Sequence, residues 1–221
     1  MNYRGPLVVA TRNEGKLREF RELLAPFGLA VKGLGEFPPI AETVEDGETF
    51  EANAVKKASF AAEKLGLATL ADDSGLVVPA LGGAPGVYSS RYAGEGSSDS
   101  ENIRKLLEEM KGAADRRASF FCVIAVACPG GGTRTYTGSC TGVITFETSG
   151  RGGFGYDPVF YYPPLKATFG EIGREEKNSV SHRGKAMLAL KADFERLLQW
   201  LEPAPFLEAG GLRCLKEEES I

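Results

Sequence analysis

Histidine is almost absent from this sequence: His182 is the only one among 221 residues, and the four cysteines form no CxxC pair. A single histidine excludes any catalytic or metal site that needs two, and with the scattered cysteines it leaves too few ligands for zinc. We therefore expect Cys122, Cys128, Cys140 and Cys214 to be reduced and to pack mostly in the core.

A long apolar run and an excess of positive charge are also missing. The first apolar run, residues 7–10, is too short for a signal-peptide core or a membrane span, which predicts a cytoplasmic protein that does not enter a membrane. The chain has 26 basic and 30 acidic side chains and a net charge of -4. This balance argues against broad binding to nucleic acid, which needs a basic face, but a few local cations could still hold a small anionic ligand.

The remaining composition, 43% apolar and 25% charged residues, is that of an ordinary globular protein. Strand-like segments are found at residues 7–11, 68–71, 119–128 and 133–146. Helices are expected to begin at or near Asn13, Thr49, Ser98 and Ser181, the last of them continuing to residue 201. The mixture predicts an α/β fold, with residues 1–202 as one domain and residues 203–221 as a C-terminal extension.

The segment from Thr11 to Lys16 is the first candidate for chemistry, because a strand ends and a helix begins there. Helix N-termini bind phosphate readily through free N–H groups and a partial positive charge, and Lys16 adds a full charge at the same place. Ordinary helix capping beside a solvated lysine would explain the same residues, so this segment alone does not decide between the two.

An acidic pair, Asp72 and Asp73, is expected at the end of the strand over residues 68–71. Adjacent carboxylates at that position suit Mg²⁺, which takes oxygen ligands, and the second carboxylate could orient a water for attack. The run Asp-Ser-Gly is also a common turn sequence. A further acidic group could come from Glu42 or Glu45 in the preceding polar loop.

A GxGxxG pattern spans residues 150–155, but a dinucleotide-binding site is rejected because Pro158 and aromatic residues follow where a helix should begin. A loop that offers Phe154 and Tyr156 is better suited to stacking on a flat base. Asp157 could accept hydrogen bonds from base N–H groups. A hairpin with core aromatics is the alternative interpretation.

Two helical segments complete the set of candidates. Ser181 is a natural N-cap, so His182 and Arg183 lie in the first turn and form a second anion or base-edge site, unless they are exposed or structural residues. The helix after residue 49 has a polar face, and such faces are usually just solvated. That face carries Glu51, Asn53, Lys56 and Lys57.

The order of these segments resembles the inosine triphosphate pyrophosphatase family over nearly the whole chain to about residue 201. The matching motifs are Thr-x-Asn-x-Gly-Lys at 11–16, Gly-x-Thr-Phe-Glu-x-Asn-Ala at 47–54, Ala-Asp-Asp-Ser-Gly-Leu at 71–76, Leu-Gly-Gly-x-Pro-Gly-Val-Tyr-Ser at 81–89, the pair Arg91-Tyr92, and the segments 153–158 and 177–184. The resemblance implies a two-lobed mixed-sheet α/β fold with a central substrate cleft, and a homodimer.

The resemblance also implies residue roles. Asp73 would be the catalytic residue, accepting the proton of the attacking water and binding Mg²⁺ together with Glu45 or Glu42. The implied substrate-binding residues are Thr11, Arg12, Asn13, Glu14, Gly15, Lys16, Lys57, Ser74, Phe154, Gly155, Tyr156, Asp157, Lys177, His182 and Arg183. Arg12 departs from the small residue common in this loop and adds a cation near the phosphates.

The implied activity is hydrolysis of inosine, deoxyinosine and xanthosine triphosphates to the monophosphate and pyrophosphate. A site that donates hydrogen bonds to the 6-oxo edge of the base would reject adenine, whose 6-amino group is also a donor. Two alternatives remain: a pyrophosphatase for other modified nucleotides, and a non-catalytic nucleotide-binding regulator. The intact acidic pair favours catalysis over the regulator.

Overall fold

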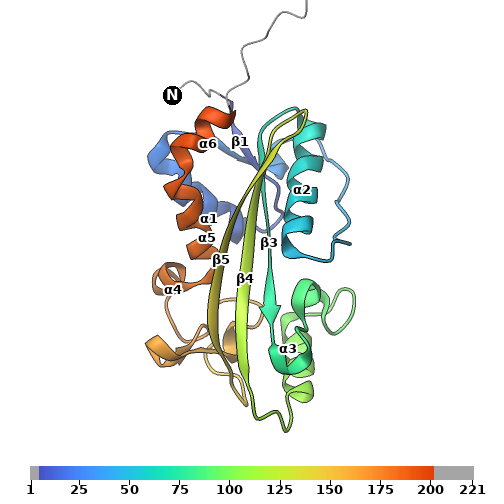
Figure 1. Ribbon diagram of the computed structural model, residues 1–221, viewed down its shortest axis with the longest axis vertical. Helices are drawn as coiled ribbons and strands as arrows, with labels where there is room; N and C mark the ends of the chain where they lie inside the picture. Colours follow the sequence, from blue (N-terminus) through green and yellow to red (C-terminus); the bar gives the residue numbers. More distant parts are fainter. Residues whose placement is uncertain (1–4, 202–221) are drawn as a thin grey trace, which may run out of the picture.

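The centre of the protein is a seven-stranded mixed sheet in the computed structural model, which describes residues 5–201 (Figure 1). The strands lie in the order β2-β1-β3-β4-β5-β6-β7. Strands β2, β1 and β3 are parallel, and the remaining neighbours are antiparallel. Their bounds are β1 (Leu7–Val9), β2 (Val31–Gly33), β3 (Thr69–Val77), β4 (Arg117–Ala127), β5 (Thr133–Ile144), β6 (Phe160–Tyr162) and β7 (Ala167–Thr168). The predicted α/β class is confirmed.

Helices cover both faces of the sheet, and most begin where the sequence predicts. The α-helices are α1 (Glu14–Leu24), α2 (Phe50–Leu65), α3 (Asp99–Glu109), α4 (Arg174–Val180), α5 (His182–Ala192) and α6 (Phe194–Leu201). The side chains of Asn13, Thr49, Ser98 and Ser181 each accept a hydrogen bond from a backbone N–H of the first turn. Such caps satisfy N–H groups that have no partner inside the helix, which is why the sequence locates these starts well.

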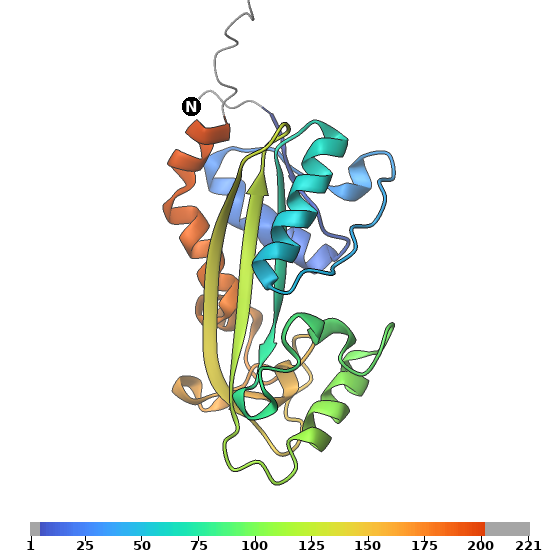
Figure 2. The same cartoon turned by 45° about the vertical axis from the view of Figure 1, so that its right-hand side comes forward.

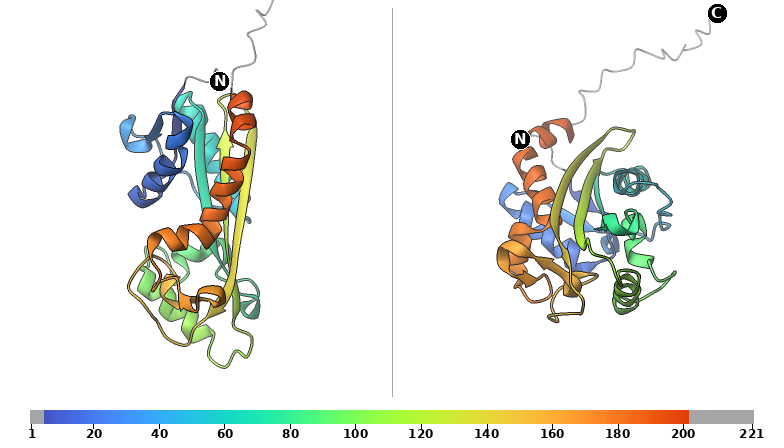
Figure 3. Two further views of the ribbon diagram at one scale, coloured as in Figure 1. Left: turned by 90° about the vertical axis from the view of Figure 1, so that its left-hand side faces the viewer. Right: turned by 60° about the horizontal axis from the view of Figure 1, so that its bottom comes forward.

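Three hydrophobic clusters form the core. Helices α1, α5 and α6 lie on one face of the sheet and α2 on the other (Figures 2 and 3). The first group packs around Phe20, Leu70 and Ile124, and the alanine-rich side of α2 packs against Ala71. The third cluster lies at the opposite end of the long strands and joins α3 to β6. We call the end with α1 and α2 the upper half, and the end with α3 the lower half. Strands β3, β4 and β5 run through both.

The prediction that the strand at 68–71 ends before the acidic pair is wrong. Strand β3 continues through it to Val77, because β4 pairs with it residue by residue, including Asp72 with Ile124 and Asp73 with Val123. A neighbouring strand that offers a hydrogen-bonding partner at every position overrides the local turn tendency of Asp-Ser-Gly.

The prediction of one helix over residues 181–201 is also wrong. The helix is interrupted at Asp193, whose carboxylate accepts a hydrogen bond from Tyr136 at 2.9 Å and pairs with Arg134 on the same strand at 3.2 Å. Asp193 is thus held against β5, and the chain restarts as α6.

Strand β2 was not predicted, and the extension at 203–221, with Cys214, lies outside the described residues. Within residues 5–201, no helix is both long and apolar enough to cross a membrane.

Candidate active site

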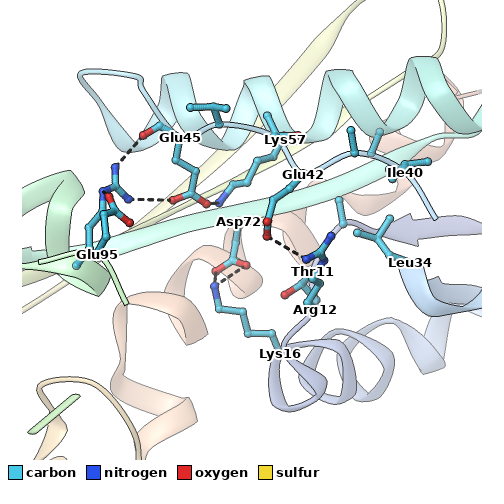
Figure 4. Close-up of a pocket in the computed structure, with 16 residues that line it drawn as sticks. Thr11, Arg12, Lys16, Leu34, Ile40, Glu42, Glu45, Lys57, Asp72 and Glu95 are labelled. Atoms are coloured by element: carbon cyan, nitrogen blue, oxygen red, sulfur yellow. Dashed lines mark hydrogen bonds and ion pairs between the residues drawn. The ribbon is translucent and has the colours of Figure 1, made fainter. Parts of the chain in front are cut away.

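Two adjoining cavities lie where the upper and lower halves meet, and Lys16 lines both. The larger one, about 690 Å³, is bounded by the end of β1, the loop at residues 40–45, α2 and β3. The smaller one, about 250 Å³, lies between the 74–75 segment of β3, the aromatic loop at residues 154–157 and the start of α5. Charged side chains make up half of the lining of the larger cavity (Figure 4). Aromatic rings contribute to the smaller one.

The two carboxylates of the acidic pair lie on opposite faces of the sheet. Successive side chains of a strand alternate between faces, so neighbours in β3 cannot share one. Asp72 is on the face of α1 and α5, where it contacts Lys16 and Arg183, and Asp73 is on the face of α2, where it contacts Lys57. Strand β1 pairs with β3 only at residues 69–70, so among the residues that the structure describes no strand covers this edge of β3 beyond that point.

Asp72 is the anionic partner of two cations. Its buried carboxylate lies 2.8 Å from Lys16 Nζ and 3.4 Å from Arg183 Nη2. Burial alone would raise the pKa of Asp72, but Lys16 and Arg183 outweigh burial and hold that pKa well below its usual range. Asp72 is therefore ionised at neutral pH, and Lys16 and Arg183 balance its negative charge.

Asp73 has a different environment. Its Oδ1 accepts a hydrogen bond from the Ser74 N–H at 3.0 Å and lies 3.7 Å from Lys57 Nζ, but its Oδ2 is buried without a hydrogen-bond partner. Burial raises the pKa of Asp73, and the Lys57 charge offsets only part of that effect. A buried carboxylate oxygen without a donor is unfavourable, so this atom is suited to a cation or a proton.

Glu45 extends this anionic site, and Glu42 does not. Glu45 Oε1 lies 2.9 Å from Lys57 Nζ, so one lysine joins Glu45 to Asp73. Glu42 is 75% exposed at its side chain and pairs with Arg12 at 3.2 Å (Figure 4). Burial alone would lower the pKa of Lys57, but nearby carboxylates, Asp73 first among them, raise it, so this lysine is charged.

These carboxylates suit a cation that brings ligands of its own. Within residues 5–201, no three His, Cys, Asp or Glu side chains lie close enough together to hold a metal ion. Asp73 and Glu45 provide two carboxylates, which Lys57 joins. Mg²⁺ commonly binds through one or two carboxylates and takes its other ligands from water and substrate phosphates, so the residues present fit it.

Asn53 is a site residue that the sequence interpretation missed. It was placed on a solvated helix face, yet it is fully buried, and its Oδ1 accepts a hydrogen bond from Gly47 N at 2.8 Å. This bond turns the amide NH₂ away from Gly47, and the amide favours the ionised form of Asp73. The spacing from Asn53 to Lys57 is one helical turn, which places both on one side of α2 and could have indicated a shared role.

The segment at residues 11–16 lies at the N-terminus of α1 as predicted. Asn13 N donates to Thr11 Oγ1 at 3.1 Å, and Asn13 Oδ1 caps the helix at Lys16 N. Thr11, Arg12 and Lys16 line the larger cavity, and Asn13 lines the smaller one. Glu14 and Gly15 line neither. Lys16 is not simply a solvated lysine, since it reaches across to Asp72 (Figure 4).

Phe154 offers an accessible aromatic face at the smaller cavity. Its side chain is 46% exposed, and the cations of Lys177 and Arg183 lie 4.5 and 5.3 Å from its ring centroid. Asp157 Oδ2 accepts a hydrogen bond from Phe154 N at 2.8 Å and pairs with Lys177. Burial raises the pKa of Asp157, and the Lys177 charge opposes that rise.

Tyr156 is part of the wall of this cavity and packs in the lower core. Its ring is buried, and its hydroxyl donates to the Ser89 carbonyl at 2.9 Å. Gly155 N donates to Asp99 Oδ2 at 2.7 Å, which fixes the loop to the start of α3. Of the two aromatic residues named for base stacking, Phe154 is the one with an exposed ring.

His182 and Arg183 are buried at the base of the same cavity. The His182 ring stacks on Phe120 with centroids 4.6 Å apart, and burial lowers its pKa well below the usual value, so the imidazole is neutral. His182 Nδ1 and Arg183 Nε have no hydrogen-bond partner in the described structure. Arg183 Nη2 also contacts Ser74 Oγ at 3.3 Å. Gly138 on β5 permits this close approach of α5, because an added Cβ would clash with the His182 carbonyl.

Comparison with known proteins gives consistent matches over most of the chain. A model of the Ham1 family matches residues 7–193. A dITP/XTP pyrophosphatase of Desulfotalea psychrophila is 53% identical over 196 residues, covering 89% of this chain and 88% of that protein. Another of Desulforamulus reducens is 56% identical over 183 residues, covering 82% and 91%. The structure of the Staphylococcus aureus Ham1 protein aligns with a TM-score of 0.82 and 42% identity, over 87% of this chain and 99% of that one.

Proposed function

The chain belongs to the Ham1 family, and on that premise we propose that it hydrolyses inosine, deoxyinosine and xanthosine triphosphates to the monophosphate and pyrophosphate. The family resemblance predicted from the motifs is confirmed. One observation carries the proposal: a cavity lined by cations and carboxylates adjoins a base-sized aromatic cavity, and Lys16 belongs to both. A nucleoside triphosphate has the same two chemical parts.

The base would occupy the smaller cavity. Phe154 offers a ring for stacking, and such stacking contributes roughly 1–3 kcal/mol per base. His182 and Arg183 line this cavity, and each has a buried side-chain nitrogen without a hydrogen-bond partner within residues 5–201, of which Arg183 Nε is a permanent donor. Donors that face a 6-oxo group would favour hypoxanthine and xanthine over adenine, because a 6-amino group would leave buried donors unpaired. Lys177 and Asp157 would form hydrogen bonds with the remaining polar edge of the base.

The triphosphate would lie in the larger cavity, where Lys16 and Lys57 approach from opposite faces of the sheet. The segment Thr11 to Gly15 would hold the phosphates through the N-terminus of α1. Both lysines would neutralise charge as pyrophosphate departs, which is electrostatic stabilisation by groups already in place. Arg12 would add a further cation from the exposed side of the cavity.

The proposed chemistry centres on Asp73. Water attacks the α-phosphorus, the new P–O bond forms as the bond to the bridging oxygen breaks, and the water proton passes to Asp73 Oδ2. That atom is the one without a hydrogen-bond partner, and a raised pKa makes its carboxylate a better proton acceptor than Asp72. Asp73 and Glu45 would hold Mg²⁺, which supplies electrostatic polarisation of the phosphates when bound. Ser74 would contact the substrate beside Asp73.

We also propose that the chain forms a homodimer in the cytoplasm, as the family resemblance implies. The candidate surface is the lower part of the outer face of β4 and β5, beyond the first residue of α2, Phe50. Phe121 is 38% exposed there, beside polar Ser139 and Thr141 of β5. Tyr88 on the neighbouring 3₁₀ helix η4 (Gly86–Arg91) is also exposed. A sheet face with exposed aromatic rings is typical of an interface.

Substituting Phe121→Asp is expected to convert the dimer to a monomer, because a charge at the centre of an apolar contact would be desolvated on association. Size-exclusion chromatography with light scattering measures this directly. Phe146→Asp is the matched control, since Phe146 is 82% exposed and lies outside this surface. Finding the wild-type protein as a monomer at micromolar concentration would contradict the homodimer, and a dimeric Phe121→Asp would contradict this surface.

Purified protein with Mg²⁺ is expected to release one pyrophosphate for each inosine or xanthosine triphosphate consumed, with far slower turnover of adenosine triphosphate. Phosphorus NMR of the products, across natural, deaminated and methylated triphosphates, provides the measurement. Release of orthophosphate would contradict attack at the α-phosphorus. A preference for modified pyrimidines would favour the first alternative enzyme. Nucleotide binding without any turnover would favour the non-catalytic regulator.

A further inference from the structure

Arg91 joins the two halves of the protein at the larger cavity. It is the last residue of η4, in the lower half, yet its Nη2 donates to the backbone carbonyl of Glu45 at 2.8 Å, and its Nη1 lies 3.8 Å from the Glu45 carboxylate. Figure 4 shows Glu45 on the loop beside α2 and Glu95 on the facing segment, and the dashed lines that run from Glu45 toward that segment are its contacts with Arg91. The family resemblance assigns no role to Arg91.

The loop that carries Glu45 has little structure of its own. Residues 37–49 form no helix or strand between the 3₁₀ helix η2 (Leu34–Glu36) and α2. Within residues 5–201, the polar side-chain contacts of residues 45–47 come from Asn53, Lys56 and Lys57 of α2, with Arg91 as the exception. Contacts from one helix fix a loop on one side, and Arg91 fixes it from the other.

The Arg91 contact differs in kind from that of Lys57. Lys57 bonds to the Glu45 side chain and is shared with Asp73, so its position depends on both carboxylates. Arg91 bonds to the main chain, and therefore holds the backbone at residue 45 whatever rotamer the glutamate adopts. The Arg91 guanidinium lies over the Tyr88 ring, 5.2 Å from its centroid, and Nε also lies 3.3 Å from Glu95, whose exposed side chain makes this a weak pair.

We propose that Arg91 is a positioning residue, which clamps the Glu45 loop across the cavity so that Glu45 and Asp73 face one divalent cation together. The proposal rests on the proposed function, because that function needs the metal site. Arg91 is itself a cation near that site and would repel a metal ion, so its benefit comes from the position it gives to Glu45. Residues that orient metal ligands typically change metal affinity by roughly 10- to 100-fold when they are substituted.

The test measures Mn²⁺ binding to the full chain by electron paramagnetic resonance of the free ion, without nucleotide. Arg91→Gln is expected to weaken Mn²⁺ binding by roughly 10- to 100-fold. Arg91→Lys is expected to keep only part of the wild-type Mn²⁺ affinity, because lysine lacks the planar guanidinium that can contact the carbonyl and the carboxylate of Glu45 together. Glu95→Gln is the matched control: it removes the neighbouring pair of Arg91 at a residue that is 89% exposed, and we expect affinity within about threefold of wild type.

A second readout follows the loop itself by hydrogen–deuterium exchange. In metal-free protein, peptides that cover residues 37–49 are expected to exchange faster in Arg91→Gln than in Glu95→Gln, whereas peptides from β4 stay unchanged and report intact folding. In turnover assays, Arg91→Gln is expected to need more Mg²⁺ for half-maximal rate, with kcat reduced at subsaturating metal and partly restored at high metal.

The proposal is overturned if Arg91→Gln binds Mn²⁺ as tightly as wild type and its loop exchanges at the same rate. It is also overturned if the variant loses affinity for pyrophosphate while both of those measurements stay unchanged, because Arg91 would then bind substrate directly. Failure of the proposed function looks different: the wild type would hydrolyse none of the triphosphates, while Mn²⁺ affinity and loop exchange would still decide the role of Arg91.

Discussion

Replacing Asp73 with asparagine is expected to lower kcat by roughly 10²- to 10⁴-fold, the usual contribution of a positioned general base. The amide keeps the shape of the carboxylate but cannot accept the proton of water at the position of Oδ2. It also removes one of the two carboxylates beside Lys57. Nucleotide binding should persist in part, because Lys16 and Asp72 on the other face of the sheet are untouched.

The pH dependence provides a second check on Asp73. Its pKa is raised by burial, so the carboxyl group becomes protonated at a higher pH than an ordinary aspartate. Activity should therefore fall as the pH drops through this raised pKa, because the protonated group neither binds a metal nor accepts a proton. Steady-state kinetics across pH measures the change in activity, and isothermal titration calorimetry with inosine triphosphate measures the nucleotide binding that Asp73→Asn retains. Near-normal turnover by Asp73→Asn, with an unchanged acidic limb, would remove Asp73 from the mechanism.

Replacing Asp72 with asparagine is expected to act mainly on stability and on KM. It would leave the half-buried Lys16 without its anionic partner, and the buried Arg183 with Glu19, 3.8 Å away, in place of the closer Asp72. Breaking a buried ion pair by removing one member costs about 3–5 kcal/mol, which corresponds to a fall in Tm of roughly 6–20 °C for a domain of this size. KM should rise, because both cations line the proposed substrate cavities and lose the group that orients them.

The pH dependence of stability gives this prediction a sign. The folded pKa of Asp72 lies well below the unfolded value near 3.8, so the stabilisation is fully present above that unfolded value and is lost as pH falls toward the folded pKa. The Tm difference between wild type and Asp72→Asn should be constant from about pH 5 to 7 and shrink below about pH 4. Scanning calorimetry measures it. Asp46→Asn, at an exposed pair with Lys56, is the control, and an equal effect there would refute the role of Asp72.

The fold was predictable from the sequence wherever short-range chemistry decides the structure. Caps at Asn13, Thr49 and Ser98 located three helices, because a side chain satisfies a backbone group two or three residues away. The course of β3 through the acidic pair was not predictable, since it depends on pairing with residues 119–127. The interruption at Asp193 likewise depends on contacts with β5, more than fifty residues earlier in the chain.

The sequence likewise predicted one part of the candidate site and not the other. Motif order identified Lys16, Asp73 and Lys57, and the structure brings all three to one cavity or its edge. The choice between Glu42 and Glu45 stayed open in the sequence, because the path of an irregular loop is set by partners outside it. Asn53 and Arg91 belong to the matching motifs but received no role for the same reason: each contacts that loop from another element. The assignment of Glu45 to the metal stays a prediction.

The alternation of Asp72 and Asp73 across β3 has a consequence for how this sequence can vary. Because side chains change face at every residue, inserting or deleting a single residue between Leu70 and Asp72 would exchange the surroundings of the two carboxylates. The proposed proton acceptor would then face Lys16 and Arg183, and the group that pairs with those cations would face Lys57. The length of this segment therefore matters as much as its residue types. A variant could keep every residue of the motif and still place each aspartate beside the wrong cations.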